Sequence, residues 1–284
     1  MEQSNFMRLT KSNFFGFHPV SYPFPQVLRK LGFNVVFQPR DFKFREYLNL
    51  VDFKKKQNVL DVGCGSGVFI DRIVTTWGVK GYGVDIAKKS VNNAKRHSLN
   101  KIVYQVSTAA KLPYPDAFFD VVLCFDTLEH ILLKDQPRVT GELLRVLKRR
   151  GKLLIYTINK NQKFTWNHLV QKTGIDILSD YDHDPLLFLD PSAVGSWLTK
   201  QGAKLQKVEL FNAFYTLALD ELIMVFCKLV AKLPSSESIA KTVLILLNFV
   251  SRIAIGPLTF LEKPWYMAKK SNSFFIYATK VEKK

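Results

Sequence analysis

Short apolar runs along the middle of the chain alternate with stretches in which apolar residues recur at helical spacing. Continuous apolar runs are typical of strands that are buried on both faces. The strands predicted from these runs are Asn58–Val62, Lys80–Asp85, Ile102–Val106, Val121–Phe125 and Leu153–Thr157. The helices predicted between them cover 68–77, 88–100 and 137–148. This alternation indicates an α/β fold with a mostly parallel sheet and helices on both faces.

Two more strands, at 204–210 and 273–280, would extend this sheet to seven strands. Before the first of them, Asp190 followed by Pro191 is an N-cap signal that predicts a further helix. We therefore expect a Rossmann-like, seven-stranded, mostly parallel sheet whose last strand comes from the end of the chain.

The apolar pattern also predicts a division into parts. Residues 1–57 are aromatic, basic and interrupted by prolines, so we expect an N-terminal helical lid, and 58–213 form the core. Residues 214–270 predict a helical hairpin cap inserted before the last strand, and 271–284 comprise that strand and a basic tail. Residues 242–261 carry a single charge, but polar residues and a Gly-Pro break argue against a clean membrane span.

The charge balance narrows the classes of partner. The 41 Lys and Arg residues outnumber 24 Asp and Glu residues, which gives a net charge of +17. Such a surplus favours an anionic membrane surface, nucleic acid or an anionic substrate, although a merely solvated basic surface is an equal alternative. Nucleic acid is unlikely because no nucleic-acid motif occurs and the basic residues are scattered. The apolar cap with basic and aromatic neighbours predicts either interfacial membrane contact or a cap packed over the active site.

The three cysteines, Cys64, Cys124 and Cys227, are widely spaced and form no CxxC pair. They indicate neither a disulfide framework nor a thiolate metal cage, which fits a reducing compartment. We expect a cytoplasmic protein, with peripheral attachment to the inner face of the membrane left open.

The strongest chemical signal is the loop Asp61-Val62-Gly63-Cys64-Gly65-Ser66-Gly67 between the first strand and its helix. Its glycines tolerate positive φ, and the following helix directs free N–H groups at a ligand. Asp85 ends the second strand, where a carboxylate can bind a ribose diol. The spacing G-x-G-x-G departs from the dinucleotide fingerprint G-x-G-x-x-G, which disfavours a dinucleotide site. A glycine turn that binds nothing is the other alternative.

The segments Val59–Gly67, Gly83–Asp85 and Leu112–Val122 resemble three motifs of the class I S-adenosylmethionine-dependent methyltransferases, in the same order. The resemblance implies that S-adenosyl-L-methionine is the cofactor. It departs from the family at Thr108, where an aspartate is usual. The implied cofactor-binding residues are Asp61, Gly63, Cys64, Gly65, Gly67, Asp85, Ile86, Thr108, Ala109 and Phe125.

Three ionisable residues, Asp126, Glu129 and His130, follow the fourth strand, and Asn159 follows the fifth. These segments are similar to those of the ubiquinone-biosynthesis O-methyltransferases. Because an imidazole can take up a proton near neutral pH, we predict that His130 is the general base, with Glu129 and Asp126 as further catalytic candidates. A histidine that only caps or packs is the alternative. The resemblance also implies a second version, in which Asp126, Glu129, His130 and Asn159 hold a divalent cation such as Mg²⁺.

Together these features predict an O-methyltransferase that acts on a hydrophobic or lipid-linked small molecule, such as a quinone precursor. An RNA or protein methyltransferase is the first alternative. A non-catalytic module that binds S-adenosylmethionine is the second.

Overall fold

The computed structural model describes residues 46–98, 100–172, 185–219 and 256–281, together with Leu222, Leu246, Val250, Ile253 and Ala254. Most of the predicted N-terminal lid and much of the predicted cap therefore lie outside the described residues. The chain divides into two compact units. The core unit contains 49–160, 181–210 and 273–284, and the second unit contains 1–48, 161–180 and 211–272. The predicted domain boundaries stay a prediction.

The core unit is built on one sheet of seven strands in the order β3-β2-β1-β4-β5-β7-β6. The strands β1 to β5 pair in parallel, and β7 runs antiparallel to β5. This arrangement confirms the predicted α/β fold and its mostly parallel sheet. The strands are β1 (Asn58–Val62), β2 (Lys80–Asp85), β3 (Val103–Val106), β4 (Phe119–Phe125), β5 (Leu147–Ile158), β6 (Ala203–Phe211) and β7 (Ser273–Lys280).

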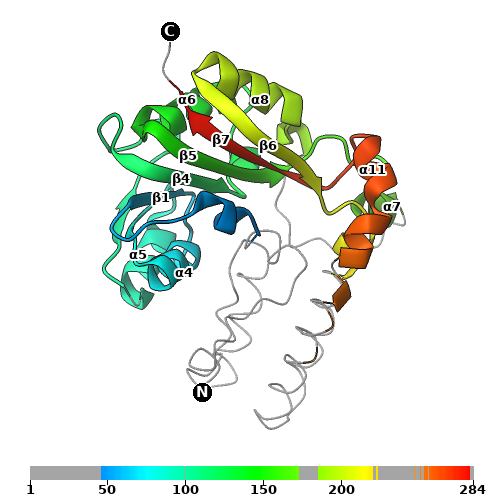
Figure 1. Ribbon diagram of the computed structural model, residues 1–284, viewed down its shortest axis with the longest axis horizontal. Helices are drawn as coiled ribbons and strands as arrows, with labels where there is room; N and C mark the ends of the chain where they lie inside the picture. Colours follow the sequence, from blue (N-terminus) through cyan, green and yellow to red (C-terminus); the bar gives the residue numbers. More distant parts are fainter. Residues whose placement is uncertain are drawn as a thin grey trace. The chain divides into compact units, whose positions relative to one another are not determined.

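Helices cover both faces of the sheet (Figure 1). One face carries α4 and α5, and the other carries α6 and α8. The predicted cap of α8 is confirmed, because the Asp190 carboxylate accepts hydrogen bonds from the N–H groups of Ser192 and Ala193. The helices of this unit are α4 (Val68–Trp77), α5 (Lys88–His97), α6 (Gln136–Val146) and α8 (Pro191–Lys200), with the short 3-10 helices η1 (Leu128–His130) and η2 (Pro185–Leu187). The second unit contributes α7 (Trp166–Lys172) and α11 (Lys263–Met267).

Two predicted boundaries are wrong for identifiable reasons. Helix α5 ends at His97 and not at Asn100, because the Asp71 carboxylate accepts hydrogen bonds from the Ser98 hydroxyl and the Asn100 N–H group. These contacts draw the chain away from helical geometry. Strand β5 begins at Leu147, where the sequence predicted the end of a helix, because Leu147 pairs with Phe119 before a register shift.

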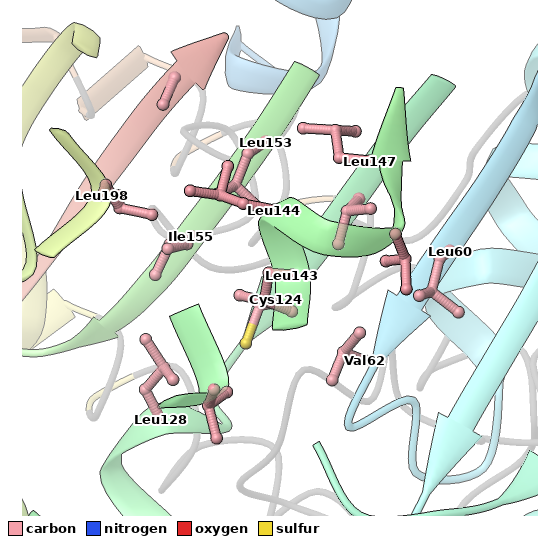
Figure 2. Close-up of a cluster of buried hydrophobic side chains, with 14 of the residues drawn as sticks. Leu60, Val62, Cys124, Leu128, Leu143, Leu144, Leu147, Leu153, Ile155 and Leu198 are labelled. Carbon is pink, nitrogen blue, oxygen red and sulfur yellow. The ribbon is translucent and has the colours of Figure 1, made fainter. Parts of the chain in front are cut away.

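The hydrophobic core lies between the sheet and the helices α6 and α8 (Figure 2). Apolar side chains of β1, β4 and β5 meet Leu143 and Leu144 of α6 and Leu198 of α8. Leu128 of η1 belongs to the same cluster and is fully buried. The turn after β4 is therefore anchored in the core.

The described residues contain no helix that is both long enough and apolar enough to cross a membrane. Cys64 and Cys124 are free and buried.

Candidate cofactor and catalytic site

The loop between β1 and α4 has the backbone geometry that its glycines predict. Gly63, Gly65 and Gly67 adopt φ values of 78°, 51° and 76°. The N–H groups of Gly63 and Cys64 donate to the carbonyl of Val84 at 2.8 and 2.9 Å, so the loop crosses the end of β2. Gly67 is the N-cap of α4. The first amides of a helix have no partner within the helix and attract negative groups of a ligand.

The side chains of Thr127 and Tyr104 pack closely against this loop. A Cβ atom at Gly63 would lie 2.1 Å from the Thr127 hydroxyl, and one at Gly67 would lie 2.3 Å from the Tyr104 hydroxyl. Tyr104 donates to the carbonyl of Gly67 at 3.3 Å. Thr127 reaches the carbonyls of Val62 at 3.0 Å and Phe125 at 2.8 Å. The glycines are thus required by close packing as well as by positive φ.

Asp85 is held in a fixed orientation at the end of β2. One carboxylate oxygen accepts from the Gly65 N–H group and the other from the Ala87 N–H group, both at 2.8 Å. A carboxylate oxygen has two lone pairs, so each can accept a further hydrogen bond from a ligand hydroxyl. The geometry fits the predicted contact with a ribose.

Asp61 lies at the end of β1 and is only 4% exposed. Burial, together with the charge of Asp85, raises the pKa of the Asp61 carboxyl to about 7. Two neighbouring carboxylates beside one loop favour a ligand that carries positive charge, and they oppose an anionic pyrophosphate. The negative charge of the site therefore favours a sulfonium nucleoside over a dinucleotide.

The segment predicted to lie along an adenine follows β3, next to Asp85. The Ser107 N–H group donates to the Asp85 carbonyl at 3.0 Å. Thr108 is exposed and Ala109 is half-buried. Ile86 is 72% exposed and offers an apolar surface directly after Asp85.

The other two predicted cofactor residues, Cys64 and Phe125, are buried. The Cys64 sulfur would lie 2.9 Å from a Cβ atom at Gly83, so its side chain packs beneath the loop. Phe125 packs against Phe69 of α4 and Phe275 of β7. Both side chains therefore support the site by packing, and the backbone N–H group of Cys64 is used within the protein by its hydrogen bond to Val84.

The predicted catalytic residues lie in the turn that follows β4. Asp126 has a positive φ of 45°, which is uncommon for a residue other than glycine. Glu129 is fully buried, and its carboxylate accepts a hydrogen bond from the Thr157 hydroxyl of β5 at 2.9 Å. His130, the next residue, is exposed. Of the titratable side chains in η1, His130 is therefore the one open to a substrate.

The structure does not support the predicted divalent cation. Glu129 and Asn159 are buried, whereas His130 is exposed, so these donors do not share one environment. Across the part of the chain that the structure describes, no three His, Cys, Asp or Glu side chains gather as a metal site. The resemblance implied a shared site, but Glu129 is buried whereas His130, the next residue of η1, is exposed.

Sequence reasoning missed the residues that position the site. Tyr104, Thr127 and Thr157 act through contacts between strands that are distant in the sequence. Arg145 of α6 is another example, since its guanidinium donates to the carbonyls of Tyr114 at 2.8 Å and Leu112 at 3.0 Å. It thereby fixes the loop before β4. No local motif signals these roles.

Comparison with known proteins identifies the domain that contains this site. Residues 60–155 match the family model described as a methyltransferase domain. The chain is 30% identical over 155 residues to a ubiquinone biosynthesis O-methyltransferase of Coxiella burnetii. This match covers 53% of the chain and 65% of the length of that relative.

Solved structures share the fold. A phosphoethanolamine N-methyltransferase 2 of Haemonchus contortus, in complex with S-adenosyl-L-methionine, has a TM-score of 0.58 at 18% identity, covering 99% of this chain and 57% of that one. The [4+2]-cyclase SpnF has a TM-score of 0.56 at 17% identity, with coverage of 86% and 82%. Residues 60–155 are therefore similar to a methyltransferase domain, and the seven-stranded sheet has the fold of S-adenosylmethionine-dependent methyltransferases.

Proposed function

We propose that this protein is an S-adenosylmethionine-dependent methyltransferase that methylates an oxygen of a hydrophobic or lipid-linked small molecule. The observation that carries the proposal is the pair of carboxylates, Asp61 and Asp85, beside a loop whose three glycines all have positive φ. A cationic nucleoside satisfies both the charge and the hydrogen-bonding capacity of this arrangement.

The residues present fit S-adenosylmethionine. Each Asp85 oxygen can accept from a ribose hydroxyl, and Asp61 can offset the positive charge of the methionine part. The first amides of α4 can bind its carboxylate. Ile86 provides an apolar surface for the adenine beside 107–109. The cofactor supplies a methyl group that is already bonded to a good leaving group.

The chain's own contribution to the transfer is alignment and proton removal. Alignment of donor and acceptor in one site can lower a barrier by about 7–11 kcal/mol. His130 is exposed at the end of β4 and would remove the proton of an acceptor hydroxyl. Glu129 would act as a positioning residue, because its contact with Thr157 fixes the turn from which His130 projects.

The class of acceptor rests on two observations. Residues 214–270 are strongly apolar, which is typical of a binding surface for an apolar molecule. The relative from Coxiella burnetii is named for ubiquinone biosynthesis and O-methylation. The structural relative from Haemonchus contortus is named for N-methylation, so an amino acceptor is the second candidate.

Transfer of a tritiated methyl group to cellular extracts tests the proposal. The purified protein is incubated with labelled S-adenosylmethionine and with a total lipid extract, total RNA or total cell protein, and labelled products are analysed by mass spectrometry. We expect label in a lipid-soluble product as a methyl ether, and much less label with the Asp85→Asn variant at the same concentration of cofactor. Label in an amine would favour the second candidate. Label only in RNA or in protein would contradict the proposal.

A further inference from the structure

The second unit exposes a row of large apolar side chains. Phe260 is 62% exposed, Leu261 51% and Met267 85%. Three more residues earlier in the chain, each in helical conformation, are also exposed and are spaced by four and three positions. The apolar stripe, as we call it, consists of Leu246, Val250, Ile253, Phe260, Leu261 and Met267.

Glu262 directly follows the exposed Leu261 in the sequence, but its carboxylate is buried. Glu262 is fully buried and accepts hydrogen bonds from the N–H groups of Phe214 at 2.9 Å and Thr216 at 2.7 Å. The hydroxyls of Thr216 and Tyr266 also donate to it. The one carboxylate of this segment is therefore buried, whereas its large apolar side chains are exposed together with Lys263.

The Glu262 contacts fix that orientation. Rotation of this segment to bury the stripe would remove the carboxylate from its hydrogen-bond donors on Ala213, Phe214 and Thr216, which is unfavourable in a buried environment. The exposed apolar surface is thus built into the second unit. Exposed apolar surface of this kind marks an interaction site.

Lysines accompany the exposed aromatic rings. The Lys263 ammonium lies 4.3 Å from the centre of the Phe260 ring, and the Lys270 ammonium lies 4.6 Å from that of Phe164, which is 48% exposed. The Trp265 indole N–H donates to the Phe164 carbonyl at 2.7 Å and so joins the two groups. Aromatic rings flanked by amines are typical of segments that lie at a membrane surface.

We propose that the apolar stripe binds the surface of an anionic lipid bilayer. Its apolar side chains would enter the boundary between headgroups and acyl chains, while Lys263 and Lys270 contact the phosphates. The net charge of +17 has the sign that such a surface attracts. The inference deepens the proposed function, because it names the place where a lipid-linked acceptor is met, but binding itself needs no methyl transfer.

Flotation of the full-length protein with vesicles tests the proposal. We expect the protein to float with vesicles that contain phosphatidylglycerol, and to float less with phosphatidylcholine alone or at high salt. The double variant Phe260→Ser/Met267→Ser should bind roughly tenfold or more weakly, because two apolar side chains no longer enter the interface. Replacing Lys263 and Lys270 by Gln should weaken binding to anionic vesicles by about fivefold per lysine.

Matched controls come from the core unit. Leu186 is 77% exposed, and Lys204 is exposed, so Leu186→Ser and Lys204→Gln make the same chemical changes outside the stripe and should bind like the wild type. Calorimetry with S-adenosylhomocysteine, run on every variant, separates loss of the fold or of the cofactor site from loss of vesicle binding. The proposal is overturned if the wild type stays unbound with anionic vesicles, or if the serine variant floats unchanged. Self-association that the serine variant abolishes, without vesicle binding, would assign the stripe to a second copy of the chain.

Discussion

The Thr127 hydroxyl occupies the space that a side chain at Gly63 would need, since a Cβ atom there would lie 2.1 Å from the hydroxyl oxygen. This contact joins the cofactor loop after β1 to the turn after β4 that carries Glu129 and His130. Thr127 also reaches the carbonyls that end both strands, those of Val62 and Phe125. We therefore expect a substitution at Gly63 to displace Thr127 and, through it, the proposed catalytic turn.

We predict that Gly63→Ala lowers the free energy of unfolding by about 1–3 kcal/mol, through the clash and the positive φ. Thr127→Ala alone should cost about 1 kcal/mol for its lost hydrogen bonds. In Gly63→Ala/Thr127→Ala the nearest side-chain atom would be the Cβ atom of residue 127 at 3.0 Å, so part of the loss should be recovered. Denaturant unfolding of the four proteins measures this coupling.

Thr127→Ser supplies the control for that cycle, because it keeps the clashing hydroxyl. Gly63→Ala/Thr127→Ser should be as unstable as Gly63→Ala. Strict additivity of Gly63→Ala and Thr127→Ala would show that the contact does not govern the loop.

The raised pKa of Asp61 predicts a dependence on pH. Between its ordinary value of 3.8 and about 7, the unfolded carboxyl is ionised while the folded one holds its proton. The folded state then binds more protons, so the cofactor-free protein should lose stability as pH rises through this window, by up to about 1.4 kcal/mol per pH unit. Asp61→Asn should flatten this slope in thermal unfolding scans.

The same carboxyl should make cofactor binding pH-dependent. Affinity for cationic S-adenosylmethionine should increase from pH 6 to pH 8 as Asp61 ionises, and by more than the affinity for S-adenosylhomocysteine, which lacks the sulfonium charge. Equal pH profiles for the two ligands, or an unchanged profile in Asp61→Asn, would exclude this role for Asp61.

His130→Ala tests the proposed base. We expect kcat to fall by about 10²–10⁴-fold, because proton removal from the acceptor is lost. The dissociation constant of S-adenosylhomocysteine should stay unchanged, since His130 is exposed in η1 and outside the glycine loop. Near-normal turnover would show that the histidine only packs or caps. His97→Ala, at the exposed end of α5, serves as the matched control.

The sequence predicted the sheet and the glycine loop because their signals are local. Continuous apolar runs identified β1, β2 and β7 to the residue, and glycine spacing identified the loop between β1 and α4. The errors arose where a distant side chain overrides a local pattern. Asp71 ends α5 three residues early, and the pairing of Leu147 with Phe119 begins β5 where a helix was predicted to end.

The cofactor residues that lie in turns after strands could be predicted from the sequence. The side chains that pack against those turns, such as Tyr104 and Thr127, could not. Asp85 and the three glycines follow from the order of strand, turn and helix. The metal site that the resemblance implied is not supported in the described residues, where Glu129 is buried and the adjacent His130 is exposed. Thr157, which binds Glu129, comes from another strand and carries no motif.

The most direct test of the central claim is isothermal titration calorimetry of the purified protein with S-adenosylmethionine, S-adenosylhomocysteine and a nicotinamide dinucleotide. We expect both sulfur nucleosides to bind and the dinucleotide not to bind. We also expect Asp85→Asn to raise the dissociation constants by roughly 10- to 150-fold, because hydrogen bonds to a charged group are lost. Absence of heat with both sulfur nucleosides, or binding of the dinucleotide in their place, would exclude the proposed cofactor site.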